Sequence, residues 1–171
     1  MKNIDNKMKI NKIKNNVKTY IVPSLKQEKI IIKSNFYENL STEQIIRKAL
    51  NHDKKGEILE ASKYYQYLIH KGLSDPKIFC NYGIILRKQG KLKRSAELHR
   101  AAIKIEPNSV EAYYNLSNTL KELGEIKEAE ISLRKAIKIK PLFAEAFNNL
   151  CSLLKNKGNL KEAKELIIQA L

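Results

Sequence analysis

Three asparagines recur at a fixed interval along the chain. Asn81, Asn115 and Asn149 lie 34 residues apart, and each directly precedes a large apolar or aromatic residue. An asparagine amide offers both a donor and an acceptor, so it can bind a peptide unit at its N–H and its C=O. A row of such amides would recognise an extended backbone with little dependence on side chains. The alternative is that asparagine is simply common at this position, in a chain rich in lysine and asparagine.

A row of basic residues follows the same interval. Arg87, Lys121 and Lys155 each lie near the end of an expected helix, where a cation is electrostatically favourable. These cations can also attract acidic side chains of a bound peptide. The candidate peptide-binding residues are therefore Asn81, Asn115, Asn149, Asn118, Tyr114, Asn148, Arg87, Lys121 and Lys155.

No set of residues with catalytic spacing accompanies these rows. His52, His70 and His99 lack the spacing of metal ligands, and each falls at a helix-packing or helix-end position. The chain contains neither a glycine-rich phosphate loop nor a nucleophile elbow. We therefore expect a protein that is not an enzyme and that holds no metal and no cofactor.

The elements that carry these residues are clearest over residues 110–141. Two amphipathic halves flank Gly124, with apolar or small residues at helical spacing on either side. Gly124 can adopt the left-handed conformation that ends a first helix, and Pro141 cannot continue a second. The stretch predicts a helix, a tight turn and an antiparallel helix.

This unit returns when the sequence is shifted by 34 residues. Gly124 corresponds to Gly90 and Gly158, and Pro141 corresponds to Pro107. A weaker copy further upstream has Gly56 at the matching position. A fixed period with matched glycines and small residues indicates stacked repeats.

The pattern resembles the tetratricopeptide repeat (TPR) family over residues 42–171. The resemblance implies an all-α fold, a right-handed α-solenoid of antiparallel helix pairs with about three and a half repeats. We place a degenerate repeat at about 42–75, two repeats at 76–109 and 110–143, and an incomplete one at 144–171. The first helices of this family line a concave groove, so the asparagines are expected to project into it. The row resembles the asparagine ladder in the repeats of O-linked N-acetylglucosamine transferase.

One known binding mode of the family is not expected here. Family members that clamp the C-terminal carboxylates of chaperones carry a lysine and an asparagine in one repeat, an asparagine in the next, and a lysine and an arginine in the third. The corresponding positions of this chain hold apolar, cysteine or acidic residues: Ile46 and Leu50, or Cys80 and Ile84, and then Glu111 or Glu145. We therefore do not predict that this chain binds chaperone tails.

The composition limits the choice of partner and compartment. The net charge is +15, but 28 of the 33 basic residues are lysine, which, with abundant isoleucine and asparagine, fits A/T-rich codons better than selection for nucleic acid. We expect protein or peptide partners and no nucleic acid. Cys80 and Cys151 do not form a disulfide framework, and no signal peptide is recognised, so we expect a cytoplasmic protein. The aliphatic run at residues 30–32 is too short to cross a bilayer, so no membrane insertion is expected.

The two ends of the chain differ from the middle. Residues 1–40 are rich in lysine and asparagine, carry a net charge of +6, and are expected to be largely disordered or extended, with β-prone residues at 20–22 and 30–32. Ser41 and Gln44 look like a capping box that opens the first helix. The last repeat stops inside its second helix, so an uncovered apolar stripe is expected to favour self-association or fraying.

These observations predict a protein-interaction scaffold that holds an extended peptide or a helix in its groove. The alternative is the substrate-recognition arm of a larger or split transferase, of the O-linked N-acetylglucosamine transferase or sulfotransferase kind, without its catalytic domain.

Overall fold

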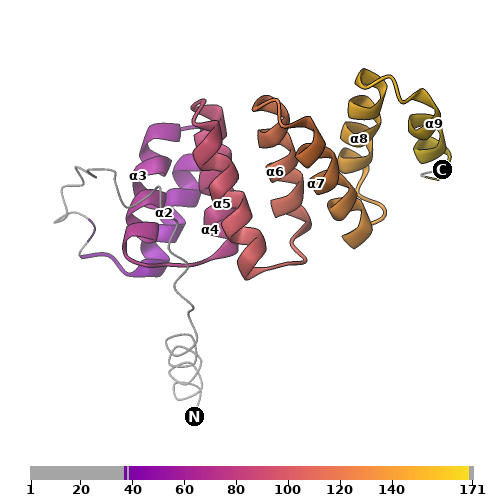
Figure 1. Cartoon of the computed structure of the whole chain (residues 1–171). Helices are drawn as coiled ribbons and strands as arrows, with labels where there is room; N and C mark the ends of the chain where they lie inside the picture. The colour runs from indigo at the N-terminus through magenta and orange to yellow at the C-terminus, as the bar shows by residue number, and fades with distance from the viewer. Residues whose placement is uncertain (1–36, 38, 170–171) are drawn as a thin grey trace, which may run out of the picture.

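The structure is a computed structural model that describes Tyr37 and residues 39–169. All regular elements of this described part are α-helices, which follow one another from one end of the molecule to the other (Figure 1). They are α2 (Thr42–Lys54), α3 (Ile58–His70), α4 (Pro76–Lys88), α5 (Leu92–Ile105), α6 (Val110–Glu122), α7 (Ile126–Ile139), α8 (Ala144–Asn156) and α9 (Leu160–Gln169). The prediction of a disordered or extended segment at 1–40, with β-prone residues at 20–22 and 30–32, lies outside the described residues except for Tyr37, Asn39 and Leu40.

The helices pack as consecutive pairs, because the turns between them are short. Helices α4 and α5, and likewise α6 and α7, make the most extensive contacts of the stack. Gly124 ends α6 with φ of 79°, a conformation that costs a residue with a Cβ about 1–2 kcal/mol. Gly56, Gly90 and Gly158 make the same turn after α2, α4 and α8. The predicted helix–turn–helix unit is therefore present in four copies among the described residues.

Local capping residues fix where the first helices α2, α4 and α6 begin, whereas α8 begins after Phe143 without a side-chain cap. The Ser41 hydroxyl accepts from the Gln44 backbone N–H, and the Gln44 side chain accepts from the Ser41 N–H, which is the predicted capping box. Asp75 accepts from the N–H groups of Lys77 and Ile78 before α4, which has Pro76 in its first turn. Ser109 accepts from the Ala112 N–H at the start of α6. These side chains satisfy amides that have no partner inside the helix.

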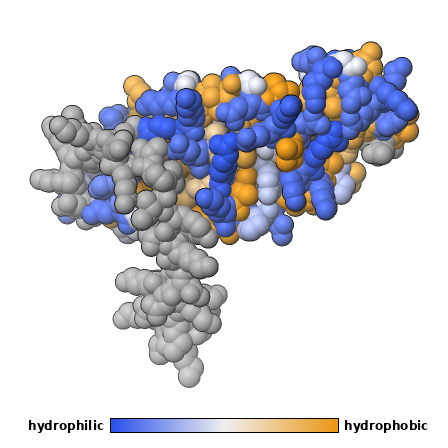
Figure 2. Space-filling model, viewed as in Figure 1, coloured by the Kyte–Doolittle hydropathy of each residue, from blue (hydrophilic) through white to orange (hydrophobic). Residues whose placement is uncertain are grey.

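The core is a ribbon between neighbouring helices and forms two clusters. The first cluster gathers apolar side chains from Tyr37 and helices α2 to α5, together with Ala112 of α6. The second gathers those of α6 to α9, together with Ala96 of α5. Ile103 packs against both clusters. Outside the part covered by grey atoms, hydrophilic and hydrophobic residues alternate along the face of the stack shown in Figure 2, as expected for a thin core.

The predicted fold class is confirmed as an all-α solenoid of helix pairs. Cys80 and Cys151 are both free thiols. Cys80 is buried, which raises its pKa to about 12 and makes its thiol unreactive at neutral pH.

Candidate functional site

The first helix of each pair belongs to one layer, and the second helix belongs to another. Helix α4 contacts α6, and the Asn149 amide of α8 donates to the Asn118 side-chain oxygen of α6 at 2.9 Å. We call the layer of α2, α4, α6 and α8 the inner layer. The outer layer of α3, α5, α7 and α9 has its own cross-links, with Arg100 of α5 bonded to Glu128 of α7 at 2.8 Å and Arg134 of α7 bonded to Glu162 of α9. All the predicted site residues lie on α4, α6 or α8 of the inner layer.

The three repeated asparagines are all half-buried, but their surroundings differ. Asn149 is bonded to Asn118, so these two amides share one hydrogen bond across neighbouring repeats. Asn81 lies near Tyr65, whose pKa is raised to about 12 by burial, and the Asn81 amide opposes this rise. The Asn115 side chain has no hydrogen bond within the described part of the chain. The row is thus partly occupied by internal contacts and partly open.

The three basic residues also differ. Arg87 is half-buried and donates to the Glu122 carboxylate of α6, so its charge is used between two inner helices. Lys121 and Lys155 are exposed and make no ion pair among the described residues. The structure therefore separates Arg87, which joins two helices, from two lysines whose ammonium groups remain available.

Two adjoining pockets lie beside these lysines. A pocket of about 310 Å³ is lined by residues of α8 alone: Asn148, Cys151, Ser152, Lys155 and Asn156. A second pocket, of about 330 Å³, lies between α8 and the turn from α6 to α7 and is lined by Lys121, Ile126, Ser152, Leu153, Asn156 and Lys157. Ser152 and Asn156 line both pockets, so the two form one continuous surface. Neither lining contains a carboxylate.

This surface, which we call the α6–α8 surface, includes three of the predicted residues, Lys121, Asn148 and Lys155. Tyr114 contacts Phe143 edge-on, with 5.2 Å between ring centroids, so it helps to pack α6 against the start of α8. Sequence analysis missed Ser152 and Asn156. The repeat period could have found them, because they occupy the positions of Asn118 and Glu122 one repeat later.

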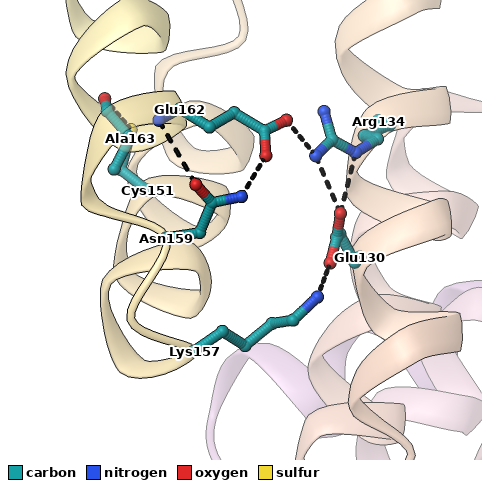
Figure 3. Close-up of polar contacts among 7 residues, drawn as sticks. All are labelled: Glu130, Arg134, Cys151, Lys157, Asn159, Glu162 and Ala163. Carbon is teal, nitrogen blue, oxygen red and sulfur yellow. Dashed lines mark hydrogen bonds and ion pairs between the residues drawn. The ribbon is translucent and has the colours of Figure 1, made fainter.

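An ionic network holds the outer side of the same repeats together (Figure 3). Glu130 of α7 accepts from Lys157 at 2.6 Å and from Arg134 at 2.7 Å, and Arg134 also bonds Glu162 of α9. The hydrogen bonds from Lys157 and Arg134 lower the pKa of Glu130. Three lysines line the pockets. The charge of one of them, Lys157, is thus balanced by the Glu130 carboxylate of the same chain.

The histidines do not assemble into a site. No group of three potential metal ligands occurs within the residues that the structure describes. His52 pairs with Glu57 and stacks on Tyr64, whereas His70 is exposed at the end of α3. His99 is fully buried in α5 against Gly83.

Together, these features define a class of protein, an α-solenoid of helix pairs with an open surface on its inner layer. Residues 110–141 match a family model described as a tetratricopeptide repeat, and residues 83–124 match a model described as a TPR repeat. The chain therefore contains tetratricopeptide repeats and is a TPR protein, as the sequence pattern predicted. No curated protein sequence matches it significantly.

Solved structures share this fold at low sequence identity. MamA is 19% identical, with a TM-score of 0.74 over 80% of this chain and 79% of that one. YrrB, described as a TPR protein with an unusual peptide-binding site, is 21% identical, with a TM-score of 0.68 over 76% of this chain and 67% of that one. A mutant O-GlcNAc transferase from Thermobaculum terrenum is 20% identical, with a TM-score of 0.62 over 66% of this chain and 22% of that one.

No helix in the described residues combines the length and the apolar character that are needed to cross a bilayer.

Proposed function

We propose that this TPR protein is a non-enzymatic scaffold that binds an extended peptide on the inner layer of its stack. The observation that carries the proposal is the α6–α8 surface, where two adjoining pockets present the amides of Asn148 and Asn156 and the ammonium groups of Lys121 and Lys155, none of which is paired with another described residue. Amide side chains bind peptide backbone, and lysines bind acidic groups. The description of YrrB as a TPR protein with a peptide-binding site supports this proposal by analogy of fold.

The asparagines give the test. Selection from a random peptide library would supply a ligand, and calorimetry would measure its affinity for the full chain and its variants. The Asn115 side chain has no hydrogen bond among the described residues, and Asn148 lines a pocket and is exposed. The Asn115→Ala/Asn148→Ala variant should therefore melt like the parent, within about 0.5 kcal/mol. It should bind roughly tenfold more weakly, because two lost hydrogen bonds together cost about 1.4 kcal/mol or more.

The matched control is Asn108→Ala, which removes an exposed amide in the turn before α6. This variant should bind like the parent. If both variants bind equally well, the inner layer is not the binding surface. If the double variant loses stability instead of affinity, its asparagines are structural. The same measurements on Asn81→Ala and Asn149→Ala test the other two repeated asparagines. Asn149→Ala should also lower the free energy of unfolding, because it removes the hydrogen bond to Asn118.

A second candidate function is the substrate-recognition arm of a larger or split transferase. The structural similarity to the repeats of an O-GlcNAc transferase favours it, since this chain spans 22% of that longer chain. The DNA next to the gene distinguishes the two functions. An adjoining transferase domain would support the second candidate. If the neighbouring genes encode no transferase domain, the scaffold function is favoured.

A further inference from the structure

The two free lysines of the α6–α8 surface face pockets that hold no negative charge. Lys157 is paired with Glu130 at 2.6 Å, whereas Lys121 and Lys155 have no ion pair within the described part of the chain. Their ammonium groups stand beside amide and hydroxyl groups of Asn148, Ser152 and Asn156. A ligand with negative charges would thus meet hydrogen-bond donors and cations together, which gives stronger hydrogen bonds than neutral partners do.

A position at a helix end does not by itself explain these lysines. Lys121 and Lys155 lie in the last turns of α6 and α8, where the helix dipole favours cations. Lys104 and Lys138 lie in the last turns of α5 and α7, also 34 residues apart and also exposed. Neither lines either of the two pockets. The two pairs therefore share charge, spacing and helix position, and they differ in the surface that they border.

The geometry of the inner layer sets the spacing of the ligand's charges. Helices α6 and α8 are neighbours joined by the 2.9 Å bond from Asn149 to Asn118. Axes of closely packed helices are about 8–10 Å apart. Helices α6 and α8 contact each other less extensively than α4 and α6 do, so their axes are at least about this far apart, and the long lysine side chains can reach across the difference. A polyproline II segment rises about 3.1 Å per residue with three residues per turn. Side chains three residues apart then lie on one face and are separated by about 9 Å.

We propose that the α6–α8 surface binds an acidic peptide segment in an extended, polyproline II-like conformation, with carboxylates three residues apart that contact Lys121 and Lys155. This inference rests on the proposed function and specifies its partner. Peptide is favoured over nucleic acid because neither pocket lining includes an aromatic side chain on which bases could stack. Both cations are lysine rather than arginine, which nucleic-acid sites prefer for planar, bidentate contacts.

The test uses labelled synthetic peptides and the full chain. The first peptide repeats Glu-Pro-Pro, the second replaces each glutamate by glutamine, and the third has the same composition with its glutamates adjacent. Fluorescence anisotropy at low salt would measure their affinities for the parent, for Lys121→Gln/Lys155→Gln and for the control Lys104→Gln/Lys138→Gln. Both variants lose the same charge from equivalent helix ends, and circular dichroism checks that both fold.

The Glu-Pro-Pro peptide should bind the parent about tenfold more tightly than the other two peptides do. The Lys121/Lys155 variant should lose about tenfold in affinity for it, whereas the control should change by less than about twofold. Added salt should weaken this binding. Equal losses in both variants would overturn the proposal in favour of a diffuse attraction to a basic protein. An oligothymidine that competes with the peptide and loses affinity in the same variant would overturn it in favour of nucleic acid.

The outcome also separates this inference from the proposed function. If library peptides bind through Asn115 and Asn148 but acidic peptides show no preference for Lys121 and Lys155, the scaffold function stands and the acidic partner is wrong. If neither acidic nor library peptides bind the parent, both are wrong.

Discussion

The side chain of His99 occupies the space where residue 83 would carry a Cβ. A Cβ built on Gly83 would lie 2.5 Å from His99 Cε1 and 2.8 Å from Nε2. One repeat later, Ser117 and Leu133 stand at the same two positions, so a side chain is tolerated there when the ring is absent. The glycine in α4 therefore reflects a close packing contact and not a turn.

The substitution Gly83→Ala sets two effects against each other. Alanine favours a helix over glycine by about 1 kcal/mol, but the clash with a fully buried ring costs about 1–3 kcal/mol. Because the buried His99 ring has no free space to move into, we expect the cost of the clash to exceed the gain in helix propensity. Urea denaturation should therefore show a net loss in the free energy of unfolding. In a His99→Leu background the same substitution should cost clearly less. An equal loss in both backgrounds would mean that His99 is not what excludes the Cβ.

His99 also makes stability depend on pH. Burial, and then the positive charge of Arg87, lower its pKa to about 3, from about 6.5 in an unfolded chain. Between about pH 3 and pH 6.5, His99 is protonated in the unfolded chain but stays neutral in the folded chain. Stability is therefore full above about pH 6.5 and falls as pH decreases towards 3, by up to about 1.4 kcal/mol per pH unit.

Urea denaturation at several pH values between 7 and 5 should show this fall in the parent. The His99→Leu variant should show a smaller slope over the same range. A slope that is identical in the two proteins would assign the pH dependence to other groups.

At the scale of elements, polar contacts join the second pair of helices to the third. Between α5 and α6 the buried Ser95 and Thr119 hydroxyls share a hydrogen bond of 3.1 Å. Arg87 with Glu122 links the inner helices of these pairs, and Arg100 with Glu128 links the outer ones. Such exposed ion pairs are worth about 0–1 kcal/mol each, so the buried hydroxyl pair is the contact with the larger consequence.

Replacing only one of these hydroxyls should therefore be the more harmful change. Thr119→Val leaves the Ser95 hydroxyl buried without this partner, at a cost of about 1–3 kcal/mol. The double variant Ser95→Ala/Thr119→Val removes both polar groups and should cost less than the sum of the single changes. Chemical denaturation of all four proteins measures the coupling. Strict additivity would show that the bond contributes nothing specific.

The caps, turns and helix register could be predicted because they depend on short-range rules. Ser41 with Gln44, Asp75 with Pro76, and Gly124 act within a few residues of themselves. Contacts between repeats could not be predicted in the same way. The spacing places Arg87 in a basic row and Asn149 in an amide row, but it does not predict that Arg87 pairs with Glu122 or that Asn149 pairs with Asn118. Helix packing brings these partners together although they are more than 30 positions apart. The period predicts which residues share a layer, but not which partners their side chains select.

For the whole molecule, the division of the core into two clusters suggests two cooperative parts. A repeat stack is stabilised by interactions between neighbours, so a weak or polar interface can separate regions that unfold independently. The boundary lies between α5 and α6, where few apolar side chains contact both clusters.

Leu116→Ala tests this division. Leu116 lies in the second cluster and is 6% exposed, so truncation should cost about 2–5 kcal/mol. Hydrogen exchange should show the loss of protection concentrated in α6 to α9, with α2 to α4 protected as in the parent. Leu68→Ala is the matched control, because Leu68 is 2% exposed in the first cluster, and it should loosen α2 to α4 instead. If either variant lowers protection equally along the whole stack, the solenoid unfolds as one unit. The polar interface between α5 and α6 would then couple the two clusters as strongly as an apolar interface does.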